Sequence, residues 1–353
     1  MTMYTLKPSK VRESIIECFE CGLVPFVTSS PGLGKSAIIA QIADEFNLEM
    51  IDIRLSMCAP EDLMGLPMRK DNGKATFATF EMFPTADTPL PEGKDGWILN
   101  LDEFNSAPRS VEAAAYKIAL DRMAGQEKLH PACYIVAAGN LATDRAIVNQ
   151  MSTAMQSRLA HIQMIVDHRD FMNHAHSAGF DHRILGFLEL MPSKLQDFRP
   201  DHQDRTFACP RTWEFASRLI KGKSRDQINL PLLAGTISDG VAMEFYTFLA
   251  EYDKIPKFQD VIDRPEQIPM PKEVGTKYAV ISMLLDNGTK TNFPDIIKYV
   301  KRLSPEFQVI FLRGAVKRIK DIRDVREYGQ ALLTLTEFMD DDDDDVKYAA
   351  AAA

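Results

Sequence analysis

A glycine-rich turn between an apolar stretch and an apolar-periodic stretch constrains this chain more than any other feature. Residues 24–29 predict a buried parallel strand, and the apolar positions that recur after Ser36 predict a helix. Between them, glycines let backbone N–H groups turn inward around an anion, and the helix N-terminus adds unpaired donors. The arrangement predicts a phosphate-binding loop. Its binding residues are Ser30, Pro31, Gly32, Leu33, Gly34, Lys35, Ser36 and Ala37.

The side chains of this loop predict its ligand. We expect Lys35 to reach the β- and γ-phosphates of a nucleotide and the Ser36 hydroxyl to ligate Mg²⁺. The usual pattern has a glycine where this chain has Ser29, a small residue at the corner of the loop. The alternative interpretation is an ordinary glycine-rich turn between a strand and a helix, which needs no partner residues elsewhere in the chain.

Such partner residues follow further along the chain. Residues 96–101 predict a strand, interrupted by Asn100, that leads directly into Asp102 and Glu103. We expect Asp102 to hold Mg²⁺ and Glu103 to polarise the attacking water, because phosphoryl transfer is catalysed mainly by positioning and charge neutralisation. An acidic pair at a strand end indicates little alone, but after a phosphate-binding loop it completes a nucleoside triphosphate site.

Further polar positions border the next predicted elements. Residues 132–138 predict a strand that is followed by Asn140, which could reach between the γ-phosphate and water or could be a turn residue. Residues 105–108 predict a helix cap followed by a proline suited to a first turn. Residues 151–160 predict a helix that carries Arg158 near its end, just before another strand.

Four motifs in this order resemble an AAA+ ATPase of the MoxR-like group. They are Ser-Ser-Pro-Gly-Leu-Gly-Lys-Ser at 29–36, Leu-Asp-Glu-Phe-Asn-Ser-Ala-Pro at 101–108, Ala-Ala-Gly-Asn at 137–140 and Ala-Met-Gln-Ser-Arg-Leu at 154–159. Segments 52–56, 61–67 and 209–214 match it further, so the resemblance covers about residues 11–220. It implies an α/β fold, with a P-loop NTPase core whose parallel sheet lies between helices, followed by an α-helical lid.

The resemblance also implies roles for individual positions. Lys35 and Ser36 are similar to the Walker A pair, Asp102 and Glu103 to the Walker B pair, and Asn140 to sensor 1. The implied catalytic residues are Glu103, Asn140, Arg158 and Arg211, and the implied metal ligands are Ser36 and Asp102.

One of these roles implies an assembly. Arg158 resembles an arginine finger that acts on the γ-phosphate held by a neighbouring subunit, which requires a ring, in this family usually a homo-hexamer. Arg145 is the competing candidate for the finger.

Arg211 resembles sensor 2, which reaches back from the lid. The predicted hairpin at 67–83 resembles the insertion that this group carries in helix 2. An ordinary surface hairpin is the alternative for 67–83.

The remaining chain suggests the domain organisation. We expect the nucleotide-binding core at 1–166, the lid at 167–258 and a helical C-terminal extension at 273–339. The proline-rich residues 260–272 predict a linker. Residues 340–353 begin with a run of aspartates and end in alanines, which predicts an acidic, low-complexity tail.

Composition excludes several classes of function. The 353 residues are 45% hydrophobic and 26% charged, as in soluble globular proteins. No apolar run of about 18 residues predicts a transmembrane helix, the first ten residues lack the apolar core of a secretory signal, and five scattered cysteines suggest reduced thiols. We therefore expect a cytoplasmic protein, and the resemblance implies a bacterium or the bacterial host of a phage.

Together these observations predict an enzyme, a ring-forming, Mg²⁺-dependent ATP hydrolase that remodels a protein client as a chaperone does. The resemblance implies a partner protein with a von Willebrand factor A domain. The alternative is an AAA+ motor or switch that acts on nucleic acid. A net charge of −9 disfavours a generally basic surface, whereas Arg69, Lys70 and Lys74 on the predicted hairpin would suit a basic pore.

Overall fold

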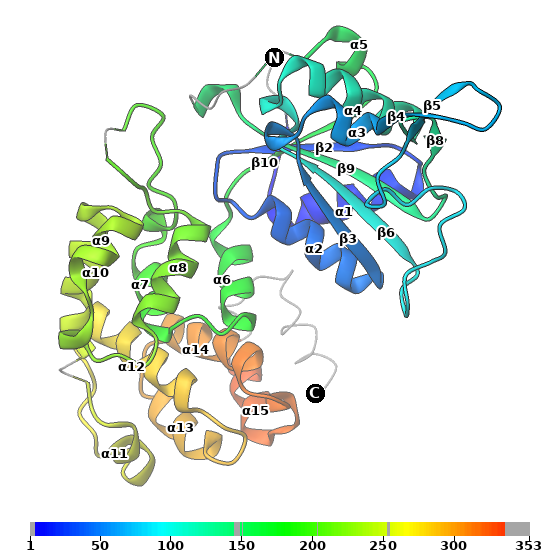
Figure 1. The fold of residues 1–353 in the computed structure, drawn as a ribbon. Helices are drawn as coiled ribbons and strands as arrows, with labels where there is room; N and C mark the ends of the chain where they lie inside the picture. The colour runs from blue at the N-terminus through cyan, green and yellow to red at the C-terminus, as the bar shows by residue number, and fades with distance from the viewer. Residues whose placement is uncertain (1–3, 145–148, 150, 203, 253–254, 336–353) are drawn as a thin grey trace. The chain divides into compact units, whose positions relative to one another are not determined.

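The computed structural model describes residues 4–335, apart from 145–148, 150, 203 and 253–254. The chain forms two compact units (Figure 1). The first contains residues 1–167 and 199–201, and the second contains 168–198 and the residues after 201. The first crossing of the chain between the two units follows Asp167.

A six-stranded sheet, parallel throughout, forms the centre of the first unit. Parallel strands have both faces covered, so their sequences are apolar along nearly their whole length. Because all the strands run the same way, their carboxyl ends meet at one edge. In sheet order the strands are β1 (Thr5–Leu6), β10 (Ala160–Met164), β2 (Pro25–Ser29), β9 (Cys133–Asn140), β6 (Gly96–Asp102) and β3 (Leu48–Arg54).

Successive strand residues point to opposite faces of this sheet, and each face packs on its own helices. Val27 packs with α1 (Pro8–Glu20) and α2 (Lys35–Glu45), whereas its neighbour Phe26 belongs to the core that contains α3 and α4. Helix α3 spans Pro60–Met64 and α4 spans Arg109–Asp121. The predicted fold class, a parallel sheet between helices with further helices beyond it, is confirmed.

Two short hairpins extend from the first unit. Strands β4 (Leu66–Arg69) and β5 (Ala75–Ala78) pair antiparallel and overlap the hairpin that the sequence predicts at 67–83. Strand β7 (Met123–Ala124) pairs with β8 (Glu127–Lys128). Gly65 precedes the first hairpin with a φ of +83°, and a Cβ there would lie 2.2 Å from the carbonyl oxygen of Ala78. A glycine is therefore required at the base of this hairpin.

The second unit is helical in its described residues. Helix α12 (Val274–Asn287) packs against α7 (His182–Leu190) and α10 (Asp239–Tyr252). The short helix α11 (Phe258–Asp263) begins just before the segment 260–272 that we predicted to be a linker. That prediction is partly wrong, because Val261 of α11 is fully buried in an apolar core. The helices are α6 (His168–Ser177), α7 (His182–Leu190), α8 (Pro210–Ile220), α9 (Leu230–Ile237), α10 (Asp239–Tyr252), α11 (Phe258–Asp263), α12 (Val274–Asn287), α13 (Phe293–Val300), α14 (Pro305–Arg318) and α15 (Arg326–Leu333). Among the helices described in either unit, none is long and apolar enough to cross a membrane.

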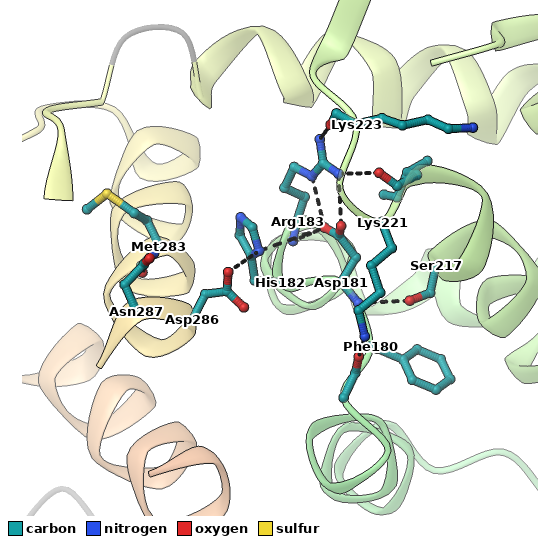
Figure 2. Close-up of polar contacts among 12 residues, drawn as sticks. Phe180, Asp181, His182, Arg183, Ser217, Lys221, Lys223, Met283, Asp286 and Asn287 are labelled. Carbon is teal, nitrogen blue, oxygen red and sulfur yellow. Dashed lines mark hydrogen bonds and ion pairs between the residues drawn. The ribbon is translucent and has the colours of Figure 1, made fainter. Parts of the chain in front are cut away.

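A buried ion pair lies at the N-terminus of α7, and its arginine also bonds to the C-terminal end of α8 (Figure 2). Arg183 donates from Nε and Nη2 to the two carboxylate oxygens of Asp181, at 2.9 and 2.8 Å, and also to the carbonyl oxygens of Ile220 and Lys223, at 2.8 and 2.7 Å. Both charged side chains are at most 10% exposed. Burial acts to raise the pKa of Asp181, but the hydrogen bonds and charge of Arg183 outweigh it and hold that pKa below its usual value.

We predict that Asp181→Asn lowers the free energy of unfolding of the second unit by about 3–5 kcal/mol at pH 7, because it leaves a buried guanidinium without its counter-charge. Urea unfolding followed by the fluorescence of buried Trp213, in a Trp97→Phe background, measures this unit separately. The folded-state pKa lies below the unfolded one, so the stabilisation is complete above about pH 4 and is lost as the pH falls through the folded value.

The matched control is Asp260→Asn, which removes an exposed partner of Arg264 and should change stability by less than about 1 kcal/mol. Equal effects of the two substitutions would contradict the importance of the buried pair.

Candidate active site

The carboxyl edge of the sheet brings together segments that are far apart in the sequence. Strand β9 lies between β2 and β6, so the polar residue that ends β9 lies between the phosphate-binding loop and the acidic pair. Ser29 is in register with Asn140, and Leu101 with Ala137. Strand order and register therefore place the predicted sensor residue at the centre of the site.

The predicted phosphate-binding loop has the backbone that this role requires. Gly32 and Gly34 have φ values of 75° and 90°, in the left-handed region that lets a chain form a concave nest of N–H groups. Leu33 between them is buried against α1 and α2 and anchors the loop. Helix α2 begins at Lys35, one residue earlier than the sequence suggested. Ser30, Pro31 and Ser36 are half-buried and Ala37 is exposed.

Lys35 connects three segments of the site. Its Nζ donates to Ser29 Oγ at 3.0 Å and to Asn140 Oδ1 at 3.4 Å. Ser29 is fully buried within β2 and its hydroxyl donates to the Ser30 carbonyl at 2.8 Å. Ser29 is not among the positive-φ residues, so its backbone does not require the glycine of the usual pattern. Its hydroxyl instead gives the lysine an acceptor.

The acidic pair lies beside the loop. Ser36 Oγ donates to Asp102 Oδ2 at 3.4 Å, and the Glu103 N–H donates to Asp102 Oδ1 at 2.8 Å. A hydroxyl and a carboxylate are hard oxygen ligands of the kind that Mg²⁺ binds, so these two residues fit the predicted metal. Glu103 has a left-handed φ of 54°, a strained conformation for a residue other than glycine and one that is often found at functional sites.

Ser56 is a site residue that the sequence analysis missed. It follows β3, the strand next to β6, and its hydroxyl donates to the Glu103 carboxylate. The signal that could have found it is a polar residue after a strand that the topology places beside the acidic pair.

Asn105 is also a missed residue, because its position suggested a helix cap. That expectation is wrong: α4 begins at Arg109 after Pro108, and Asn105 lies in the 3₁₀ turn Phe104–Ser106. Its side-chain amide instead donates to the Asn140 carbonyl at 2.8 Å and accepts from the Asn140 N–H at 3.1 Å.

The polar interruption of β6 has a local partner. Asn100 is fully buried and donates from Nδ2 to Asp52 Oδ1 at 2.6 Å on the neighbouring strand β3. The neighbouring strand thus satisfies the amide nitrogen of Asn100, whereas its Oδ1 is buried without a hydrogen-bond partner among the described residues.

The three candidate arginines lie in different parts of the chain. The helix predicted at 151–160 is a single short helix, α5 (Thr153–Gln156), because the buried Leu159 and strand β10 follow it directly. Arg158 therefore lies after the helix, exposed on the surface of the first unit. Arg145 lies outside the described residues. Arg211 is exposed in the first turn of α8, in the second unit.

The sequence matches no family model and no curated protein sequence. Solved structures that resemble the fold include NtrX from Brucella abortus, at 14% identity over 90% of this chain and 69% of that one, with a TM-score of 0.39. A point mutant of RuvB from Thermotoga maritima is similar at 14% identity over 73% and 74% of the two chains, with a TM-score of 0.39. NtrX from Brucella abortus in complex with ADP is similar at 14% identity over 88% of this chain and 67% of that one, with a TM-score of 0.37. Likeness at this level assigns no function, so the function rests on the residues of this chain.

Proposed function

We propose that this chain is a Mg²⁺-dependent ATPase of the AAA+ type that works in a homo-hexameric ring and remodels a protein client. The observation that supports it most strongly is the meeting of Lys35, Ser36, Asp102 and Asn140 at one edge of a parallel sheet. These side chains come from the start of α2 and from the ends of β6 and β9. ATP binding and hydrolysis require these side chains to converge, whereas a purely structural turn does not require it.

Each residue of the site has a separate role in ATP hydrolysis. Lys35 and the N–H groups of the loop bind the β- and γ-phosphates. Ser36 and Asp102 would hold Mg²⁺, which neutralises phosphate charge when bound. Glu103 accepts a proton from the attacking water, and Asn140 orients that water against the γ-phosphate. Ser56 holds the Glu103 carboxylate by its hydroxyl hydrogen bond.

The ring is proposed from the position of Arg158. The residue is exposed on the first unit, whereas Met155 and Leu159 on either side of it are buried in the core and hold the segment in place. An exposed arginine on a fixed segment suits a finger that stabilises charge on a neighbour's γ-phosphate. Arg211 would act as sensor 2 from the second unit, and a protein with a von Willebrand factor A domain is the partner we propose.

The hairpin β4–β5 supports a protein client rather than a nucleic acid. It exposes Arg69, Lys70 and Lys74, but also the apolar side chains of Leu66 and Met68, which are 52% and 49% exposed. Exposed apolar groups favour contacts with protein. Salt-sensitive stimulation of ATP hydrolysis by DNA would instead favour the nucleic-acid motor.

We predict that Lys35→Ala weakens ATP binding by about 10- to 100-fold. The reason is that hydrogen bonds to charged groups contribute about 1.5–3 kcal/mol, and about 1.4 kcal/mol is a factor of ten. Calorimetric titration with Mg·ATP measures the change. Lys10→Ala is the control, because Lys10 pairs with Glu13 on the exposed surface of α1. Unchanged affinity in the Lys35 variant would refute the phosphate-binding assignment.

We predict that Glu103→Gln retains ATP affinity within about threefold but lowers the turnover number by about 10²–10⁴, because general-base catalysis typically contributes that factor. Phosphate release and nucleotide titration measure the two quantities on one preparation. Glu127→Gln, on the exposed strand β8, is the matched control. Wild-type turnover in the Glu103 variant would show that another group activates the water.

We predict that Arg158→Ala leaves ATP binding to an isolated subunit unchanged and lowers hydrolysis in the assembly by about 10³-fold or more, as arginine fingers do. Mixing Arg158→Ala and Glu103→Gln subunits gives a sharper test, since some interfaces then pair an intact Glu103 with an intact Arg158. Activity should partly recover on mixing.

Two results would count against this assignment. Normal hydrolysis by Arg158→Ala alone would refute it. Subunit exchange without recovery would indicate that Arg145 is the finger or that hydrolysis requires an uninterrupted ring.

A further inference from the structure

The side-chain amide of Asn105 contacts both backbone groups of one residue. Its Nδ2 donates to the Asn140 carbonyl at 2.8 Å, and its Oδ1 accepts from the Asn140 N–H at 3.1 Å. Two antiparallel hydrogen bonds between an amide and the backbone of one residue fix both its position and its rotation, which one bond cannot do. Asn140 is the last residue of β9, where the pairing of the sheet stops supporting the backbone.

The surroundings of this pair are shaped to admit the amide. Gly139 precedes Asn140, and a Cβ at Gly139 would lie 2.4 Å from Asn105 Oδ1 and 2.9 Å from the ring of Phe26. Asn105 is 8% exposed, and its own carbonyl accepts from the Asn149 N–H at 2.7 Å. The amide is therefore held in place from its backbone side, and it can approach Asn140 only because residue 139 has no side chain.

The other side of Asn140 faces the phosphate-binding lysine. Asn140 Oδ1 accepts from Lys35 Nζ at 3.4 Å, so the backbone of Asn140 is held by Asn105 while its side chain points into the site. A displacement of about 1 Å in a group that orients a reactant can lower the reaction rate by about 100-fold, although substrate affinity is little changed.

We propose that Asn105 is a positioning residue for ATP hydrolysis, which acts by fixing the backbone of Asn140 so that its side chain meets the γ-phosphate and the attacking water. This inference rests on the proposed ATPase function. Asn105 acts through Asn140 rather than on the nucleotide itself. It couples the turn after the acidic pair to the end of β9, so that Glu103 and Asn140 keep a fixed relation to each other.

The first test compares three substitutions in the full-length chain by steady-state ATP hydrolysis. Asn105→Ala should lower kcat by about tenfold or more and leave KM within about twofold. Asn105→Asp keeps the acceptor for the Asn140 N–H but loses the donor to its carbonyl, so its kcat should lie between those of the wild type and Asn105→Ala. Gly139→Ala should reproduce the loss of kcat without altering either amide, because its methyl group displaces Asn105.

The matched control is Thr79→Val. Thr79 donates from Oγ1 to the Ala124 carbonyl at 3.3 Å, so its loss also removes a hydrogen bond between a side chain and the backbone of the first unit. Neither Thr79 nor Ala124 bonds to Asn105 or Asn140 in these contacts, and kcat should stay within about twofold of wild type. An equal fall of kcat in Thr79→Val and Asn105→Ala would reduce Asn105 to a general stabiliser of the unit and overturn the proposal.

A double-mutant cycle separates action through Asn140 from independent action. If Asn105 acts only by placing the Asn140 side chain, Asn105→Ala should change kcat by less than about twofold in an Asn140→Ala background. The same factor in both backgrounds would overturn the proposal.

A measurement without nucleotide keeps this proposal distinct from the ATPase function. The Asn140 N–H, which donates to Asn105 Oδ1, should be protected from hydrogen exchange in the wild type and should exchange at least about tenfold faster in Asn105→Ala. The wild type could show no ATP turnover while Asn105→Ala still loses the protection. That result would refute the proposed function but not the contact. Equal exchange in both proteins would refute the contact itself.

Discussion

The hydrogen bonds of Lys35 are the contacts on which the rest of the site depends. Its ammonium group reaches Ser29 at the end of β2 and Asn140 at the end of β9, and the next residue, Ser36, reaches Asp102 at the end of β6. Three strand ends are thereby joined through two adjacent residues at the start of α2. The arrangement is possible because a parallel sheet directs all its carboxyl ends to one edge, where the dipole of the following helix also points.

Much of this site was predictable from the sequence, because its parts are local patterns. The glycine loop, the lysine and the acidic pair each follow a short apolar strand, and the strands were recognisable by their apolar runs. The unusual Ser29 and Asn100 were visible as departures, but their partners were not. Ser29 accepts a hydrogen bond from Lys35, six residues away. Asn100 donates to Asp52 on β3, and the sequence alone does not show that β3 pairs with β6.

What could not be predicted depends on strand order and on tertiary packing. Asn105 looked like a helix cap because polar residues before a helix usually are caps. Only the placement of β9 beside β6 brings it to Asn140, 35 residues away. The helix expected at 151–160 shortened to α5 for a similar reason, since the chain must bury Leu159 and enter β10. Val261 shows the same effect in the second unit, where it is buried in an apolar core by α11, a helix that overlaps the start of the predicted linker and ends before its first proline.

The measurement that tests the central claim most directly is ATP turnover by the wild-type protein as a function of its own concentration, with Mg²⁺ and with EDTA. If the site is complete only when a neighbour supplies Arg158, the rate per subunit should rise with protein concentration to a plateau and should vanish with EDTA. A rate per subunit that does not depend on concentration from well below to well above assembly would contradict the shared site. No turnover at any concentration, with Mg²⁺ present, would contradict the ATPase itself.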